Sequence, residues 1–371
     1  MKIGVISTHS FPITASGTIT HTGDVVIADL VRSLNDLGHE VYFAAPDGSH
    51  IPTNGKLLPM MASFGKYPPS SQECEEDCFN KHVNSFLECD IIHDFSVSKI
   101  ITEKLFALGK NNLISTIMGG AWTHEYSPKN LVVWTQSHRN RVLRGATDYE
   151  NTLTPNMAGA PQKPVKEVHV VNGGVDTNFY TPTYNKKDFY LWMNRWHETK
   201  GYKMAIEVAR KTGIKLVMAG EHPDREMFDY QKKCALEAIE LAKDLPNVSF
   251  FWLPPDPDHH IAKRELYRQA KALLYTVQFH EPFGLSQTEA LSCATPVIGT
   301  NYGSVPEIIK SGITGYVSNN NLDEYCEIVK KSDKLNYSEC RKDAVSRFDR
   351  LVMAKNYLTE YQNIIDGKVW I

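Results

Sequence analysis

The chain has 371 residues, more than a single hydrophobic core normally organises, so two domains are the first expectation. Hydrophobic residues make up 42% and charged residues 22% of the sequence, which is normal for a folded globular protein and excludes a disordered chain. A formal net charge of −3 provides no basic excess, and we therefore expect no nucleic-acid partner.

The seven cysteines are scattered along the chain and are not paired at metal-ligand spacing. We interpret them as reduced thiols of a cytoplasmic protein, because disulfide frameworks are typical of small secreted domains. The apolar run at residues 1–7 is too short for a signal peptide, and no stretch of about 18 apolar residues could span a bilayer. Peripheral contact with a membrane surface stays open.

Short apolar runs alternate with amphipathic stretches through the first half of the chain. A strand at residues 3–7 precedes a helix at residues 24–37, whose apolar residues recur at helical spacing. Further strands are expected at residues 40–45, 91–96, 113–118, 131–137 and 167–171. We interpret residues 54–88, which contain an acidic cluster, as a solvated loop followed by a surface helix.

The alternation restarts near residue 189, after a polar segment at residues 182–187 that we interpret as a linker. Strands are expected at residues 189–193, 215–219, 248–253, 272–278 and 296–299. Helices are expected at residues 203–211, 224–243, 260–270, 284–293 and 305–310. The amphipathic stretch at residues 350–365 predicts one further helix.

Strands that alternate with helices are typical of βαβ units and of parallel sheets covered on both faces. We therefore expect an α/β protein with two doubly wound Rossmann-like domains that face a cleft. The N-terminal domain is expected at residues 1–181 and the C-terminal domain at 188–349, with a helix at 350–371 whose return to the first domain is left open. Ligands of such sheets bind beyond the carboxyl ends of the strands, so the residues that follow each strand are the candidates for a site.

Two cations follow the strand at residues 189–193. Arg195 can donate a forked pair of hydrogen bonds, and Lys200 adds a mobile point charge just before Gly201 and the next helix. Two cations in such a turn suit a diphosphate, although an ordinary solvated turn has the same composition.

Two carboxylates follow the strand at residues 272–278. Glu281 and Glu289 are separated by about 12 Å at the helical rise of about 1.5 Å per residue, near the distance between the hexose and the ribose of a nucleotide diphosphate sugar. Gly284 allows a ligand to approach the backbone, and free N–H groups at the start of the helix favour an anion such as phosphate. Carboxylates accept hydrogen bonds from sugar hydroxyls, although surface glutamates would give the same pattern.

Residues 281–317 closely resemble the donor-site signature of the family 4 retaining glycosyltransferases. That signature has two glutamates separated by seven residues, a Pro-Val-Ile strand, a Gly-x-x-Pro-Glu turn and a Thr-Gly strand, and all of these are present here. Arg195 and Lys200 resemble the diphosphate pair of that family, and residues 172–179 resemble its Asn-Gly-Val-Asp turn with one extra glycine. The resemblance spans nearly the whole chain and is more specific in the C-terminal half.

The resemblance implies the type B glycosyltransferase (GT-B) fold, with the donor bound C-terminally and the acceptor N-terminally. Arg195 and Lys200 would neutralise the diphosphate leaving group, Glu281 would hold the transferred sugar and Glu289 would hold the ribose. The remaining donor contacts would come from the backbone of Phe283, Gly284 and Leu285. The reaction would move a hexosyl group from a UDP-sugar, with a GDP-sugar as the alternative, and would retain the anomeric configuration. The acceptor is left unidentified among small molecules, glycans and lipid-linked glycans.

The chain departs from the family pattern at two positions. Relatives often carry a histidine at the end of the strand matched by residues 113–118, whereas this chain has Met118 and Gly119 there, with His124 six residues on. We treat Met118, Gly119 and His124, together with Gly23, as candidates on the acceptor side or near the transferred sugar. Trp252 stands where relatives usually have glycine, which leaves the geometry of base recognition open.

Two further patterns favour ordinary structural roles over a site. Asp256 and Asp258 resemble the metal-binding Asp-x-Asp of the other glycosyltransferase fold, but they lie in a proline-rich loop of the wrong architecture, so no catalytic metal or other cofactor is expected. A run of basic residues would fit an anionic acceptor or a membrane surface, but a solvated helix face is the favoured interpretation. The run consists of His138, Arg139, Arg141 and Arg144.

Two other functions compete with a glycosyltransferase. A UDP-N-acetylglucosamine 2-epimerase uses a similar fold, but the cation pair and the paired glutamates argue against it. A non-catalytic nucleotide- or carbohydrate-binding protein is favoured by one feature, the methionine at position 118.

Overall fold

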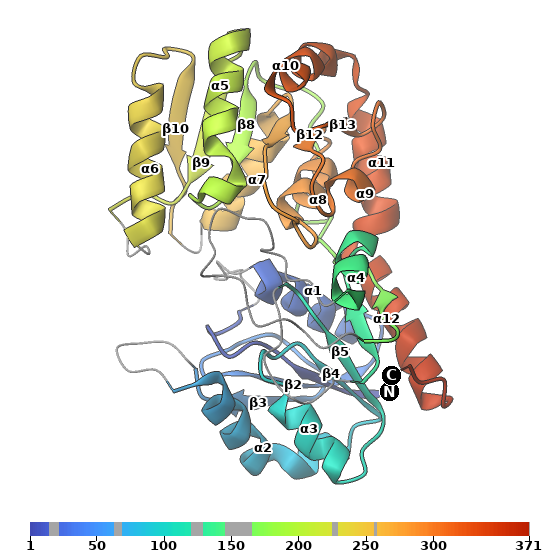
Figure 1. Cartoon of the computed structure of the whole chain (residues 1–371). Helices are drawn as coiled ribbons and strands as arrows, with labels where there is room; N and C mark the ends of the chain where they lie inside the picture. The colour runs from blue at the N-terminus through green and yellow to red at the C-terminus, as the bar shows by residue number, and fades with distance from the viewer. Residues whose placement is uncertain are drawn as a thin grey trace. The chain divides into compact units, whose positions relative to one another are not determined.

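The computed structural model describes residues 1–14, 22–62, 69–119, 129–144, 165–224, 229–255 and 258–370. The chain divides into two compact units, each built around a parallel sheet (Figure 1). The first unit contains the described residues up to Gly174 together with those from Arg350 onward, and the second contains Val175–Asp349. The expected α/β architecture of two doubly wound domains is confirmed.

The division falls between Gly174 and Val175, before the linker expected at residues 182–187, because hydrogen bonds attach the segment after Gly174 to the second unit. Arg341 donates hydrogen bonds to the carbonyl oxygens of Thr177 and Tyr180, at 2.9 and 3.0 Å. The backbone N–H of Val175 donates to the carbonyl of Phe348 at 2.8 Å. These bonds attach the segment after Gly174 to the second unit.

The first unit has a seven-stranded parallel sheet in the order β3-β2-β1-β4-β5-β6-β7. Its strands are β1 (Lys2–Ile6), β2 (Glu40–Pro46), β3 (Lys56–Met60), β4 (Ile91–Asp94), β5 (Leu113–Thr116), β6 (Leu131–Val133) and β7 (His169–Val170). Its helices are α1 (Thr22–Asp36), α2 (Ser71–Leu87), α3 (Ile100–Ala107), α4 (Gln136–Leu143) and α12 (Arg350–Ile365). In the register, Ile3 lies opposite Val41 on one side and Ile91 on the other.

The interpretation of residues 54–88 was correct for the helix and wrong for the loop. Residues 56–60 form the edge strand β3, which pairs in parallel with β2. Helix α2 begins with a capping box between Ser70 and Glu73, and it buries Cys74, Cys78 and Phe86 against the sheet. One face of this helix is therefore core, which the surrounding charged residues obscure in the sequence.

The strand expected at residues 131–137 is shorter than predicted. It ends at Val133 because the side chain of Thr135 accepts a hydrogen bond from the backbone N–H of His138 and so caps α4. A capping threonine and a strand threonine look alike in a short apolar run.

The second unit has a six-stranded parallel sheet in the order β10-β9-β8-β11-β12-β13. Its strands are β8 (Tyr190–Met193), β9 (Leu216–Gly220), β10 (Val248–Trp252), β11 (Leu273–Tyr275), β12 (Val297–Thr300) and β13 (Gly315–Ser318). Its helices are α5 (Tyr202–Thr212), α6 (Asp229–Ala242), α7 (His259–Gln269), α8 (Leu285–Ser292), α9 (Val305–Ile308), α10 (Leu322–Lys331) and α11 (Tyr337–Phe348). No helix among the described residues is both long and apolar enough to cross a membrane.

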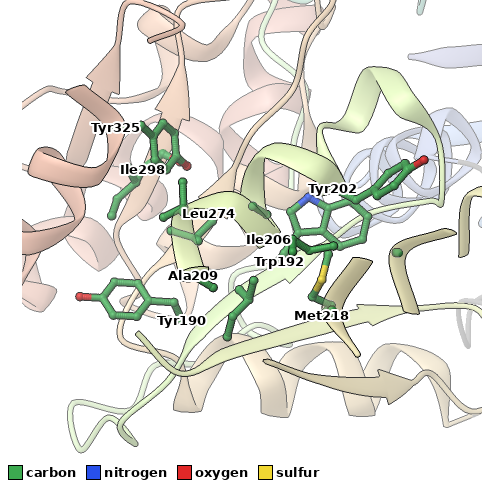
Figure 2. Close-up of a cluster of buried hydrophobic side chains, with 14 of the residues drawn as sticks. Tyr190, Trp192, Tyr202, Ile206, Ala209, Met218, Leu274, Ile298 and Tyr325 are labelled. Atoms are coloured by element: carbon green, nitrogen blue, oxygen red, sulfur yellow. The ribbon is translucent and has the colours of Figure 1, made fainter. Parts of the chain in front are cut away.

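The core of the second unit lies between its sheet and the helices α5, α6 and α10. Figure 2 shows side chains from neighbouring strands, among them Trp192, Met218 and Leu274, meeting Ile206 of α5 and Tyr325 of α10. Burial of large side chains such as these stabilises the fold by about 2 kcal/mol each. The packing holds the strands in register and so fixes where their carboxyl ends lie.

Candidate functional site

The chain order of the second sheet changes direction between two neighbouring strands. From β8 the chain first adds β9 and β10 on one side, and it then returns to place β11 directly beside β8, where Leu273 pairs with Leu191. Ligands of doubly wound sheets bind at such a topological switch point, beyond the carboxyl ends of the strands. Arg195 and Lys200 follow β8, and Glu281 follows β11, so the sheet brings these predicted residues to one place.

Gly201 allows the loops after β8 and β11 to touch. It has a φ of +73°, and a Cβ atom at this position would lie 1.7 Å from the carbonyl oxygen of Thr276, so only glycine fits. The hydroxyl of Thr276 donates to the Gly201 carbonyl at 2.8 Å, and the N–H of Gln278 donates to the Thr199 carbonyl at 2.7 Å. These bonds join the two loops and place Lys200 next to the residues that follow β11.

Lys200 and Glu281 form an ion pair at the centre of the site. The Nζ of Lys200 donates to Oε2 of Glu281 at 2.6 Å and lies 4.5 Å from the centre of the Phe279 ring. The hydroxyl of Tyr275 donates to the same Oε2 at 2.8 Å. Burial is the largest influence on the pKa of Lys200 and lowers it, the charge of Glu281 opposes this effect and the charge of Arg195 adds to it.

Arg195 is the exposed cation of the site. Its side chain is exposed and makes no hydrogen bond or ion pair with the rest of the described chain, yet its charge lies near enough to lower the pKa of Lys200. An exposed guanidinium beside a half-buried lysine produces a region of positive potential that suits an anionic ligand.

Helix α8 begins at this region and adds backbone donors. Gly284, with a φ of +77°, precedes the helix and offers no side-chain cap, so the first N–H groups of α8 keep their capacity to bind an anion. The carbonyl of Phe283 accepts a hydrogen bond from the hydroxyl of Ser304 at 2.7 Å. Leu285, the first residue of the helix, is buried.

The turn after β12 supports the backbone of Glu281. The N–H of Ser304 donates to the Glu281 carbonyl at 2.8 Å. A Cβ atom at Gly303 would lie 2.4 Å from both the N and the O of Glu281, so the close approach requires glycine. The Gly-x-x-Pro-Glu turn of the sequence therefore acts as a backbone support for the first glutamate.

Glu289 lies on α8 and is fully buried. The hydroxyl of Tyr180 donates to its Oε1 at 2.8 Å, and the Nζ of Lys263 on α7 donates to Oε1 and also lies within 3.0 Å of Oε2. Although burial alone would raise the pKa of Glu289, the charge of Lys263 and the hydrogen bond from Tyr180 hold it below its usual range. The sequence pattern did not indicate Tyr180 or Lys263 as partners of Glu289.

Two polar atoms around the site are buried without a hydrogen-bond partner among the residues that the structure describes. They are the Nδ2 of Asn194 and the Oε1 of Gln287. Buried polar atoms in native proteins are nearly always paired, so unpaired donors and acceptors in one region indicate a place for a polar ligand.

The candidates in the first unit are less closely defined. Gly23 is buried in the first turn of α1, and Met118 and Gly119 follow β5, where Gly119 is exposed. His124 lies outside the described residues. The structure brings together the predicted residues of the second unit only.

The interpretation of the basic run as a solvated helix face was wrong for two of its members. His138 and Arg141 on α4 are buried, with 2% and 5% of their surfaces exposed. Arg139 is half-buried and donates to the carbonyl of Val168 at 2.7 Å, while Arg144 donates to the carbonyl of Asn140 at 3.1 Å. His138, Arg139 and Arg141 are therefore engaged in packing or hydrogen bonding within the first unit.

Trp252 and the Asp-x-Asp pattern lie at and after the end of β10. Trp252 ends the strand and stacks on Phe250, with ring centres 5.6 Å apart, while the His222 ring meets it edge-on at 5.0 Å. Asp256 lies outside the described residues, and Asp258 directly precedes α7. Of these residues, Trp252 ends β10 and His222 lies just after the end of β9, both at the carboxyl edge of the second sheet.

Comparison with known proteins places these features in a family. Residues 177–344 match the family described as "Glycosyl transferases group 1". Over 165 residues the chain is 26% identical to the alpha-maltose-1-phosphate synthase of Mycolicibacterium smegmatis, a match that covers 40% of this chain and 41% of that protein. The chain thus spans less than half the length of the curated relatives it matches.

Solved glycosyltransferases share the fold over the whole chain. AviGT4, a glycosyltransferase involved in avilamycin A biosynthesis, superposes with a TM-score of 0.72 at 20% identity over 100% of both chains. Anabaena Alr3699/HepE, solved in complex with UDP-glucose, superposes with a TM-score of 0.64 at 15% identity over 98% of this chain and 100% of that chain. The two sheets of this protein therefore have the GT-B fold.

Proposed function

We propose that this chain, whose residues 177–344 match the family described as "Glycosyl transferases group 1", moves a hexosyl group from a nucleotide diphosphate sugar to an acceptor. One observation carries the proposal. At the switch point of the second sheet, the exposed Arg195 and the Lys200–Glu281 pair lie together beside the start of α8. This combination provides cations for a diphosphate and a carboxylate for sugar hydroxyls.

Arg195, Lys200 and the first N–H groups of α8 would bind the diphosphate. Negative charge grows on the leaving phosphate as the glycosidic bond breaks, and fixed cations and N–H groups stabilise that charge without reorganising. Because these groups supply the positive charge themselves, we propose a reaction that uses no metal ion. Lys200 is already partly removed from water, which strengthens its interaction with an incoming anion.

The two glutamates would bind the two sugars of the donor. Glu281 would accept hydrogen bonds from hydroxyls of the transferred hexose, and Glu289 would accept them from the ribose. Retention of anomeric configuration, with the acceptor attacking on the face from which the phosphate departs, is proposed from the family resemblance. Catalysis would then depend mainly on positioning and on charge stabilisation.

We propose a UDP-sugar as the donor, with a GDP-sugar as the alternative. Support for uridine comes from the fold neighbour Alr3699/HepE, which was solved with UDP-glucose. The acceptor is proposed to be a small molecule, a glycan or a lipid-linked glycan that binds to the first unit. All seven cysteines are free and buried, which agrees with a reducing compartment, and we propose that the protein acts in the cytoplasm.

A thermal-shift panel with UDP, GDP, ADP and their common sugar conjugates, with and without a chelator, tests the proposal. A ligand that binds only the folded state raises the melting temperature. We expect UDP or a UDP-sugar to stabilise the protein equally well with and without chelator. If no nucleotide stabilises it, the donor site is assigned wrongly, and if chelator abolishes the effect, metal-independent binding is wrong.

A further inference from the structure

Each of the paired glutamates is held in the same way, by one buried tyrosine and one lysine. Oε2 of Glu281 accepts hydrogen bonds from Tyr275 at 2.8 Å and from Lys200 at 2.6 Å. Oε1 of Glu289 accepts them from Tyr180 at 2.8 Å and from Lys263 at 3.0 Å. At Glu281 both donors converge on one carboxylate oxygen, whereas at Glu289 the tyrosine selects Oε1 and Lys263 lies 3.0 Å from both oxygens.

The second oxygen of each carboxylate is left for another partner. Oε1 of Glu281 accepts no hydrogen bond from the described chain, and 12% of the Glu281 side chain is exposed. Oε2 of Glu289 is buried without an aligned hydrogen bond, although the Nζ of Lys263 lies 3.0 Å away. A carboxylate held by one oxygen presents the other in a defined direction, which is what recognition of a sugar hydroxyl requires.

The tyrosines are suited to act as permanent donors. Tyr275 is 1% exposed and Tyr180 is 4% exposed. Burial, reinforced by the neighbouring glutamate, raises the pKa of both tyrosines well above its usual value, so both keep the phenolic proton at any physiological pH. A lysine is a mobile point charge that attracts either carboxylate oxygen, whereas a phenolic hydroxyl on a fixed ring selects one.

The local backbone is also built around the Tyr275 hydroxyl. A Cβ atom at Gly284 would lie 2.7 Å from that hydroxyl and 3.1 Å from Cγ of Glu281. The glycine that starts α8 therefore makes room for the Tyr275–Glu281 hydrogen bond. For the pair at Glu289, Arg341 holds the backbone of Tyr180 by donating to its carbonyl at 3.0 Å.

We propose that Tyr275 and Tyr180 are positioning residues that divide recognition of the donor between them. Tyr275 orients Glu281 toward the transferred sugar, and Tyr180 orients Glu289 toward the ribose. The inference rests on the proposed function, because it takes the roles of the two glutamates from it. It adds that the affinities for the two sugars of the donor are set by two separate tyrosine hydroxyls.

The test compares Tyr275→Phe and Tyr180→Phe by calorimetric titration with two probes, UDP and UDP-glucose. Tyr275→Phe should weaken UDP-glucose binding about tenfold and leave UDP binding unchanged, because only the glucose reaches Glu281. Tyr180→Phe should weaken both ligands about tenfold, because both carry the ribose. The control is Tyr190→Phe, which removes a buried hydroxyl of the same unit that lies 3.0 Å from the hydroxyl of Ser332 and should change neither affinity.

A second set of variants separates positioning from general structure. If Tyr275 acts through Glu281, then Tyr275→Phe should cause no further loss of UDP-glucose affinity in a Glu281→Gln background, and Tyr180→Phe should cause none in a Glu289→Gln background. Equal loss of both ligands in Tyr275→Phe, no loss in either variant, or additive losses in the double variants would overturn the inference. A wild-type protein that binds neither UDP nor UDP-glucose would instead contradict the UDP-sugar donor of the proposed function, and the inference with it.

Discussion

The two units use charged residues at the carboxyl ends of their strands in opposite ways. At the β8–β11 switch point, Arg195 is exposed, and one carboxylate oxygen of Glu281 accepts no hydrogen bond from the described residues. In the first unit, by contrast, the charged and polar residues that end β4 face into the packed layers. A charge at the end of a strand is therefore a weak indicator of a site until its partners are known.

The end of β4 shows how completely such residues can be used in packing. His93 is fully buried, and its ring nitrogens lie 2.6 Å from the hydroxyl of Tyr361 and 2.7 Å from that of Thr116. On the opposite face, Asp94 accepts from Thr102 at 2.6 Å and pairs with buried Lys99 at 3.5 Å. Both residues are fully buried and bound to neighbouring side chains, so these groups serve folding.

The largest effect is expected when the contact between the loops that follow β8 and β11 is lost. Gly201→Ala should destabilise the protein by about 3–4 kcal/mol, because the added Cβ collides with Thr276 and the backbone is left-handed. Gly213→Ala is the matched control, with a φ of +72° and open space around it, and should cost about 1 kcal/mol. Urea denaturation measures both, and equal losses would show that the loop contact contributes nothing.

The exposed cation of the second unit should affect activity without affecting stability. Arg195→Ala should lower kcat for hydrolysis of the donor sugar about a hundredfold, because the growing charge on the leaving phosphate loses a stabilising partner. The melting temperature should stay unchanged, since Arg195 holds no partner in the described chain. Arg210→Ala removes an exposed arginine of α5 and serves as the control. An undiminished kcat would eliminate the leaving-group role.

The buried histidine of the first unit should affect stability through pH. Burial, reinforced by Lys99, holds the pKa of His93 well below its usual value of about 6.5, so the unfolded chain binds more protons than the folded one below that pH. Stability is therefore complete above about pH 6.5 and is lost as the pH falls, by at most about 1.4 kcal/mol per pH unit. Native-state hydrogen exchange of the β4 amides, corrected for intrinsic rates, measures this loss.

A His93→Gln variant separates the effect of the histidine on stability from that of Glu75, whose stability contribution changes with pH in the opposite direction. Burial raises the pKa of Glu75 to about 7, so its contribution is present at low pH and is lost as the pH rises toward that value. The glutamine variant should lose less stability than wild type between about pH 6.5 and 5. Parallel pH profiles for the two proteins would show that His93 does not titrate on unfolding.

Local patterns in the sequence predicted the architecture and much of the donor-site chemistry. Apolar runs alternating with amphipathic stretches predicted two parallel sheets, because strand and helix periodicities depend only on neighbouring residues. The residues at the start of the helix at 284–293 predicted an anion-binding helix terminus, whereas the role of the Gly-x-x-Pro-Glu turn in supporting Glu281 emerged only from the structure. The family match over residues 177–344 and the GT-B neighbours confirm this reading of the fold and the family.

Residues that are far apart in sequence came together only in the tertiary structure. Lys200 meets Glu281 across 81 positions and Tyr180 meets Glu289 across 109, and no local spacing connects either pair. The burial of α2, His138 and Arg141 likewise depends on which face a neighbouring element covers. The sequence alone thus determined the elements and the residue types at the ends of the strands. The folded chain decided which charges are available to a ligand, because pairing and burial are properties of the packed whole.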